Sequence, residues 1–266
     1  MDLSILIATV PPRKNYLNRL LTSLQNQIVN NNLQDLIEIV IYKDNFEKSL
    51  GEKRNFLIEN SLGKYVVFID DDDMVSDDYC KDIFEVIRTK DVDQISITKR
   101  WFEKDKSLPI KISKNFGFYS VIFFKNLHLE ESIENKNFIL KLKIGDNTML
   151  SNKNFLSSFF MYFLFFLSKK FVTSCVTYTH PMTPIKKEIV NKIKFSNRPK
   201  SQDVEWICKM YKNKLIKSEH IIDKELYYYY FDKNVSIKRD KNNLPKFGDD
   251  LDWELREIDK INIKWL

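Results

Sequence analysis

The stretch KYVVFIDDDDMVSDDY, residues 64–79, indicates how the rest of the chain folds. A short apolar run at 65–69 ends directly in four consecutive aspartates, Asp70 to Asp73. Like charges side by side repel each other and add nothing to stability. The pattern therefore predicts a buried strand that ends at a site for a positive group.

The residues on the N-terminal side of this stretch alternate between strand and helix patterns. Apolar runs at 3–9 and 36–44 predict two further strands, and the segments 16–28 and 50–63 have helical spacing. Continuous apolar strands that alternate with helices are typical of a parallel sheet covered on both faces. We therefore expect an α/β fold with a mostly parallel central sheet flanked by helices.

Three of the expected strand ends carry polar or turn-forming residues. They are the turn at 9–12, Asp44, and Asp70 to Asp73. In open sheets of this kind, ligands bind beyond the carboxyl ends of the strands. We therefore expect these three ends to converge on one crevice.

The elements beyond the acidic stretch are less regular. Residues 126–154 are polar and rich in Asn and Lys, and their pattern assigns no element. Elsewhere the pattern predicts helices at 77–89, 201–215 and 249–261, a helix opened by Pro184, and strands at 94–102, 117–125, 220–232 and just before the loop that contains His180.

The composition narrows the class of protein. Of the 266 residues, 43% are hydrophobic, which is enough for a globular core. Only five glycines are present, so a glycine-rich phosphate loop is not expected. Three widely spaced cysteines form neither a zinc pattern nor a disulfide framework. The first residues lack a secretory signal, so we expect a cytoplasmic protein.

Two segments suggest surfaces for a partner. The net charge of +6 is modest, but the segments 186–200 and 209–217 are basic. They are either solvated helix faces or a surface for an anionic acceptor or a membrane. The apolar segment 155–172 is shorter in its uninterrupted part than the roughly 20 residues that span a bilayer. We interpret it as a buried or interface helix, with peripheral membrane contact as the alternative.

Several motifs together resemble family 2 glycosyltransferases with a GT-A fold. They are LSILIATVPPR (3–13), Asp44, GEKRN (51–55) and FIDDDD (68–73). THPMTPIKK (179–187) and SQDVEW (201–206) resemble the acceptor half of that fold. The family commonly has Glu-Asp where this chain has Gln202-Asp203.

The resemblance implies one catalytic domain, residues 1–240. Its nucleotide-sugar-binding half would be 1–100 and its acceptor half 101–240. Residues 241–266 would form a helical tail packed on the domain.

By the same resemblance, the acidic turn would hold a divalent cation, Mn²⁺ or Mg²⁺. Asp72 would bind the metal directly, and Asp70 would contact the ribose or a metal-bound water. Asp71 would lie on the donor side, and Asp73 would face the acceptor or the donor sugar. His180 would be a third metal ligand or an acceptor contact.

The remaining donor contacts would come from the first three strand ends. Asp44 would accept a hydrogen bond from the imide N–H of uracil. Lys53 and Arg54 would approach the diphosphate or the donor sugar. Thr9 and Pro11 would shape the wall of the nucleotide pocket.

On the acceptor side, Asp203 is the expected general base. An inverting transfer needs one carboxylate that takes the proton of the acceptor hydroxyl. Trp206 lies one turn further on and could be a sugar platform or a core residue.

We therefore expect a metal-dependent, inverting glycosyltransferase that moves a sugar from a nucleotide sugar to a hydroxyl of a glycan. The resemblance implies that the donor is a UDP-sugar. The same apparatus could act on hydroxymethylated bases in DNA. A non-catalytic nucleotide- or sugar-binding module is a further alternative, because Gln202 departs from the family pattern. A nucleotidyltransferase would need a glycine-rich first turn, which residues 8–12 lack.

Overall fold

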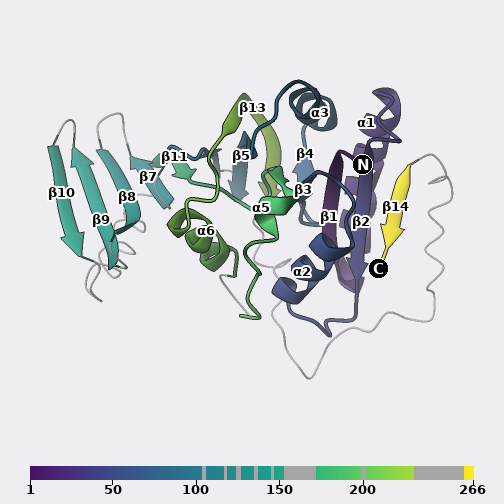
Figure 1. The fold of residues 1–266 in the computed structure, drawn as a ribbon, viewed down its shortest axis with the longest axis horizontal. Coiled ribbons are helices and arrows are strands. Elements are labelled where there is room, and N and C mark those ends of the chain that lie inside the picture. The colour runs from purple at the N-terminus through teal and green to yellow at the C-terminus, as the bar shows by residue number, and fades with distance from the viewer. Residues whose placement is uncertain are drawn as a thin grey trace.

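The computed structural model describes residues 1–103, 106–116, 119–123, 127–134, 137–144, 147–152, 172–198, 202–230 and 261–266. These residues build one mixed sheet with helices on both faces (Figure 1). The strand order is β10-β9-β8-β7-β11-β6-β5-β12-β3-β1-β2-β14, and β13 pairs with β4 and β5.

The first part of the chain forms the predicted parallel layer. Strands β1 (Leu3–Thr9), β2 (Ile37–Lys43) and β3 (Tyr65–Phe68) are parallel, with β1 in the middle. The connecting helices are η1 (Pro11–Arg13), α1 (Lys14–Asn30) and α2 (Leu50–Asn60). After β3 come β4 (Met74–Val75) and α3 (Tyr79–Thr89).

Two apolar cores lie on opposite faces of this layer. Successive residues of a strand point to opposite faces. Ile5 accordingly packs with Leu21 of α1 and with residues of α3, whereas Leu6 packs with Leu57 of α2 and Trp206. Both faces are therefore covered, which explains the continuous apolar runs in the strands.

The second part of the sheet is mixed. Its strands are β5 (Gln94–Glu103), β6 (Lys106–Ile112), β11 (Val172–Thr177), β12 (Ile185–Lys186) and β13 (Glu219–Tyr230). Strand β5 runs parallel to β13 but antiparallel to β6 and β12. The expected parallel arrangement thus holds for the nucleotide half, and antiparallel pairs join it beyond β3.

The helices of this second part are short. Pro184 does not open a helix as expected, because Ile185 pairs with both β3 and β5 and continues the sheet. Helix α5 (Lys187–Val190) begins only after this strand. Helix α6 (Gln202–Lys212) confirms the helix predicted at 201–215.

An antiparallel meander extends one end of the sheet (Figure 1). It consists of β7 (Tyr119–Phe123), β8 (Leu127–Glu134), β9 (Asn137–Ile144) and β10 (Asn147–Asn152). Strand β7 confirms the strand predicted at 117–125, whereas the other three lie in the region that the sequence pattern did not assign. Residues 153–171, most of the apolar segment, lie outside the described residues.

The last residues of the chain close the opposite edge of the sheet. Strand β14 (Asn262–Trp265) pairs in parallel with β2. This differs from the expected helical tail: the open edge of β2 offers unpaired backbone groups, and β14 satisfies them. The predicted helix 249–261 lies almost entirely outside the described residues, and the domain boundaries stay a proposal.

Within the described ranges, no helix is both long enough and apolar enough to cross a bilayer. The three cysteines are free, and Cys80 and Cys175 are buried.

Candidate active site

The acidic turn divides into two buried and two accessible carboxylates. The turn follows β3 and is closed by a hydrogen bond of 3.0 Å from the backbone N–H of Asp73 to the carbonyl of Asp70. Asp71 and Asp73 are fully buried. The side chains of Asp70 and Asp72 are 29% and 17% exposed. Only this alternate pair can reach a ligand in the crevice.

Asp73 is held by strand β13. One of its oxygens accepts a hydrogen bond of 2.6 Å from the hydroxyl of Tyr227, and the other accepts one of 2.9 Å from the backbone N–H of Tyr230. Burial raises the pKa of Asp73 well above its usual value, and the charge of Asp70 adds to the shift. This enclosure argues against the sugar contact expected for Asp73, which instead anchors the turn to β13.

Arg13, which follows the first strand, bridges two acids of the turn. Its Nη1 lies 2.7 Å from Asp71 Oδ1, and its Nη2 lies 2.9 Å from Asp72 Oδ2. Burial raises the pKa of Asp72 to about 6, and Arg13 opposes the shift. Asp71 is enclosed beside Thr9, which is 1% exposed, so the structure places both of these residues beneath the crevice rather than in contact with a donor.

Asp44 stabilises the turn before α2. It accepts hydrogen bonds from the backbone N–H groups of Phe46 (3.2 Å) and Lys48 (2.9 Å) and forms an ion pair with Lys53. The side chains of Asp44 and Lys53 are almost fully buried. Among the described residues, Asp44 Oδ2 accepts only the bond from Lys48, so a base could contact Asp44 only where this buried oxygen became accessible. Lys53 is directed to Asp44 rather than to a diphosphate. Pro11, at the start of η1, is half-buried at the end of β1.

Among the described side chains, Arg54 is the one best placed to bind a nucleotide sugar. It is 3% exposed, and its guanidinium carbon lies 5.5 Å from the ring centroid of Phe68 and 5.3 Å from that of Phe195. Its Nη2 lies 3.6 Å from Asp70 Oδ1. Its buried Nη1 has no hydrogen-bond partner among the described residues. A buried N–H group without a hydrogen-bond acceptor lowers the stability of the fold. An anionic ligand would supply the missing acceptor.

The glycine of GEKRN joins the two halves of the site. A Cβ at Gly51 would lie 2.1 Å from the carbonyl oxygen of Ser196, so only glycine allows this approach. The start of α2 is fixed by a capping box between Ser49 and Glu52. Helix α2, which carries Arg54, is thereby packed against the segment that precedes α6.

Both ring nitrogens of His180 are directed at protein groups. Nδ1 accepts a hydrogen bond of 3.3 Å from the backbone N–H of Met182, and Nε2 lies 3.4 Å from Nζ of Lys99. Burial lowers the pKa of His180 well below its usual value, and the charges of Lys99 and Arg54 add to the shift. A ring that faces a cation in this way is a poor metal ligand, which argues against the metal role expected for His180.

Asp203 lies in the first turn of α6. Its charge acts on Lys99 and on Tyr229, the same groups on which Asp70 and Asp73 act. Its Oδ1 accepts a hydrogen bond of 3.0 Å from the backbone N–H of Val204. The position is compatible with a general base, and that role stays a prediction.

Trp206 is a core residue. It is 1% exposed, its indole N–H donates to the carbonyl of Ile193 at 3.1 Å, and its ring stacks on Phe195 with 5.1 Å between centroids. The sugar platform that the sequence left open for Trp206 is therefore not supported.

Replacing Trp206 with Ala should destabilise the fold. We expect Trp206→Ala to lower the free energy of unfolding by about 3–5 kcal/mol, the usual cost of removing a large buried aromatic side chain. Urea denaturation would measure the change. Trp206→Phe, which keeps a stacked ring, should lose less. Equal stability of Trp206→Ala and wild type would contradict the burial.

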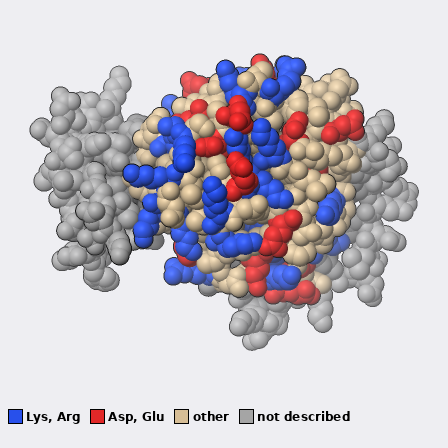
Figure 2. Space-filling view, viewed as in Figure 1, with Lys and Arg blue, Asp and Glu red and all other residues tan. Residues whose placement is uncertain are grey.

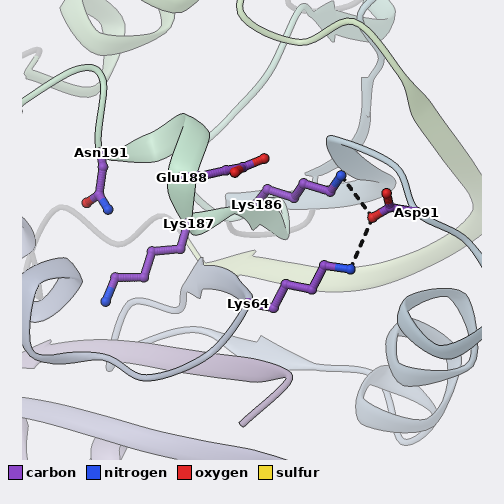
Figure 3. Close-up of a pocket in the computed structure, with 6 residues that line it drawn as sticks. All are labelled: Lys64, Asp91, Lys186, Lys187, Glu188 and Asn191. Carbon is purple, nitrogen blue, oxygen red and sulfur yellow. Dashed lines mark hydrogen bonds and ion pairs between the residues drawn. The ribbon is translucent and has the colours of Figure 1, made fainter.

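A separate pocket of about 450 Å³ lies at the other end of β3 (Figure 3). Lys64, just before β3, and Lys186 of β12 both pair with Asp91, at 3.1 and 2.9 Å. Lys187, Glu188 and Asn191 complete its lining. The acidic turn follows the carboxyl end of β3, so this pocket is not the expected donor site.

Part of each basic segment pairs with acids. Lys209 lies 2.7 Å from Glu205, and Lys186 pairs with Asp91. Figure 2 shows basic and acidic side chains interspersed over the described face. These contacts engage only some of the basic side chains, so both interpretations of the segments stay predictions.

The described residues contain no group of three or more His, Cys, Asp or Glu side chains arranged around one metal position. A Mg²⁺ or Mn²⁺ ion that binds with substrate phosphates needs only one or two protein carboxylates. The accessible pair, Asp70 and Asp72, fits that requirement.

The model of glycosyl transferase family 2 matches residues 39–172, just over half of the chain. The chain belongs to glycosyl transferase family 2. The resemblance drawn from the sequence motifs is thereby confirmed. A comparison with curated proteins found no match.

Solved structures confirm the GT-A fold. TarS 1–349 of S. aureus superimposes with a TM-score of 0.52 at 18% identity, over 86% of this chain and 60% of that fragment. The complex of the same fragment with UDP-GlcNAc gives a TM-score of 0.53 at 17% identity, over 88% of this chain and 59% of that one. This chain thus spans about 60% of the length of the TarS fragment.

Proposed function

We propose that this glycosyltransferase is metal-dependent and inverting, and that it transfers a sugar from a nucleotide sugar to a hydroxyl of a glycan. The observation that carries the proposal is the division of the acidic turn. Asp70 and Asp72 are accessible at the end of β3, whereas Asp71 and Asp73 are enclosed. A chain that needed only a solvated turn would gain nothing from this arrangement.

The turn keeps accessible carboxylate surface for a divalent cation. Arg13 pairs with Asp71 and Asp72, Arg54 lies 3.6 Å from Asp70, and Asp73 is hydrogen-bonded to β13. Asp72 would hold the cation, and Asp70 would hold it or its water. When bound, such a cation acts as a Lewis acid on the diphosphate leaving group.

The donor would be a nucleoside diphosphate sugar, with uridine the first base to test. The TarS fragment has been solved in complex with UDP-GlcNAc and with UDP, and its fold is the fold of this chain. Arg54 would donate its unpaired Nη1 to the diphosphate.

Inversion would require one carboxylate on the acceptor side, and Asp203 is the candidate. It would accept the proton of the acceptor hydroxyl while the anomeric carbon is attacked from the face opposite the diphosphate. A glycan acceptor is favoured over DNA because the net charge of +6 is modest for a chain of this length.

A thermal-shift experiment would test the donor site. UDP, GDP, ADP and their sugars would each be added with and without Mn²⁺. A ligand at 100 times its Kd stabilises the folded protein by about 2.7 kcal/mol. We expect one nucleotide to raise Tm by several degrees, and only with the metal. The absence of a shift with every nucleotide would contradict the proposal and favour a degenerate binding module.

A further inference from the structure

Lys99 is a buried cation near the acidic turn. The function proposed above gives it no role. It lies on β5 and is 6% exposed. Burial lowers its pKa, and the carboxylates of Asp73, Asp70 and Asp203 oppose the shift. Lys99 therefore lies near both the acidic turn and the candidate base.

Among the described residues, the surroundings of Lys99 offer its ammonium group only one long hydrogen-bond contact. Its Nζ lies 3.4 Å from His180 Nε2 and 5.0 Å from the ring centroid of Tyr229. No carboxylate of the described residues forms an ion pair with it. The charges that act on Lys99 are thus near it but not in contact with it.

The contact with His180 can satisfy only one of the three N–H groups of the ammonium. At 3.4 Å it is also long for a hydrogen bond. Lys99 can therefore donate its other hydrogens to a group that is not part of the described chain.

The strand order indicates which part of the donor that group belongs to. From one side to the other the order is β2, β1, β3, β12, β5. Asp44 follows β2, the acidic turn follows β3, and Lys99 lies on β5. A donor with its base near β2 and its diphosphate at the acidic turn would extend its sugar toward β5.

We infer that Lys99 binds the transferred sugar, and that this sugar is neutral and offers hydroxyl groups as acceptors. The inference rests on the proposed function and names the subsite that selects the donor sugar. A neutral sugar is favoured over a uronate because Asp70, Asp73 and Asp203 already surround the position with negative charge. The carboxylate of a uronate would be repelled by these three aspartates.

The experiment compares binding of a nucleoside diphosphate with binding of its sugar derivatives. Titration calorimetry with Mn²⁺ would measure both for wild type and for Lys99→Met, which keeps the length of the side chain. We expect Lys99→Met to bind the diphosphate as wild type does, but to weaken binding of the neutral nucleotide sugar about tenfold or more, as for loss of a charge-assisted hydrogen bond. Lys111→Met, on an exposed position of β6, is the matched control and should change neither.

Each outcome decides a different claim. If wild type binds no nucleotide, the proposed function fails, and this inference fails with it. If wild type binds but Lys99→Met keeps the full contribution of the sugar, or if wild type prefers a uronate donor, Lys99 does not have this role. Should Lys99→Met not fold, deoxy-sugar donors tested on wild type provide the same comparison, because a donor without the contacted hydroxyl must bind about tenfold more weakly.

Discussion

Asp72→Ala is expected to abolish metal-dependent nucleotide binding and to reduce sugar transfer by at least 10²–10³-fold, on the order of the loss of one group that stabilises developing charge. Asp72 is one of the two accessible acids of the turn. Its removal leaves Arg13 paired with Asp71 at 2.7 Å, so the turn keeps its main internal contact. The fold should therefore survive while the cation loses its direct ligand.

Two measurements would test the expectation for Asp72. Calorimetry with the nucleotide, with and without Mn²⁺, reports the metal site, and a transfer assay reports the chemistry. Asp77→Ala is the matched control, because Asp77 is an exposed acid just after the same turn. Unchanged turnover in Asp72→Ala would overturn the metal assignment.

The parallel half of the fold was predictable because its signals are local. Apolar runs such as 3–9 are buried at every position except Ala8, which is partly buried, and helices separate the runs. The meander at 127–152 was not assigned, because its strands are interrupted by polar turns and stay short. Alternation such as that of NFILKLKI in β9 was the signal that could have found them. Strand β14 was not predicted, because it is stabilised by pairing with β2, which lies more than 200 residues earlier in the chain.

The position of the site was predictable, but the direction of its side chains was not. The sequence places four aspartates at a strand end, and only contacts from β13 and η1 decide that Asp71 and Asp73 are enclosed. Arg13 ends the motif LSILIATVPPR (3–13), and a cation at the end of the first strand is a sequence signal for a partner of the acidic turn. Lys99 gave no sequence signal, since one lysine in a strand is ordinary until its burial is known.

Asp203→Asn is expected to retain donor binding and to lower the transfer rate about 10²–10⁴-fold, which is the usual contribution of general base catalysis. The amide keeps the shape of the side chain and its acceptor for the N–H of Val204, but it cannot take a proton. Nucleotide binding with Mn²⁺ should stay within a factor of a few of wild type. The rate should fall through kcat more than through KM.

The neighbouring acid of the same helix provides the control for Asp203. Glu205 contacts Ser196 at 2.6 Å and Lys209 at 2.7 Å, so it is directed at the protein rather than at the crevice. Glu205→Gln should therefore leave transfer nearly unchanged. NMR of the product would show an anomeric configuration opposite to that of the donor. If Asp203→Asn transfers sugar at the wild-type rate, the base lies elsewhere, and Asp70 becomes the next candidate because it is the other accessible acid beside the donor.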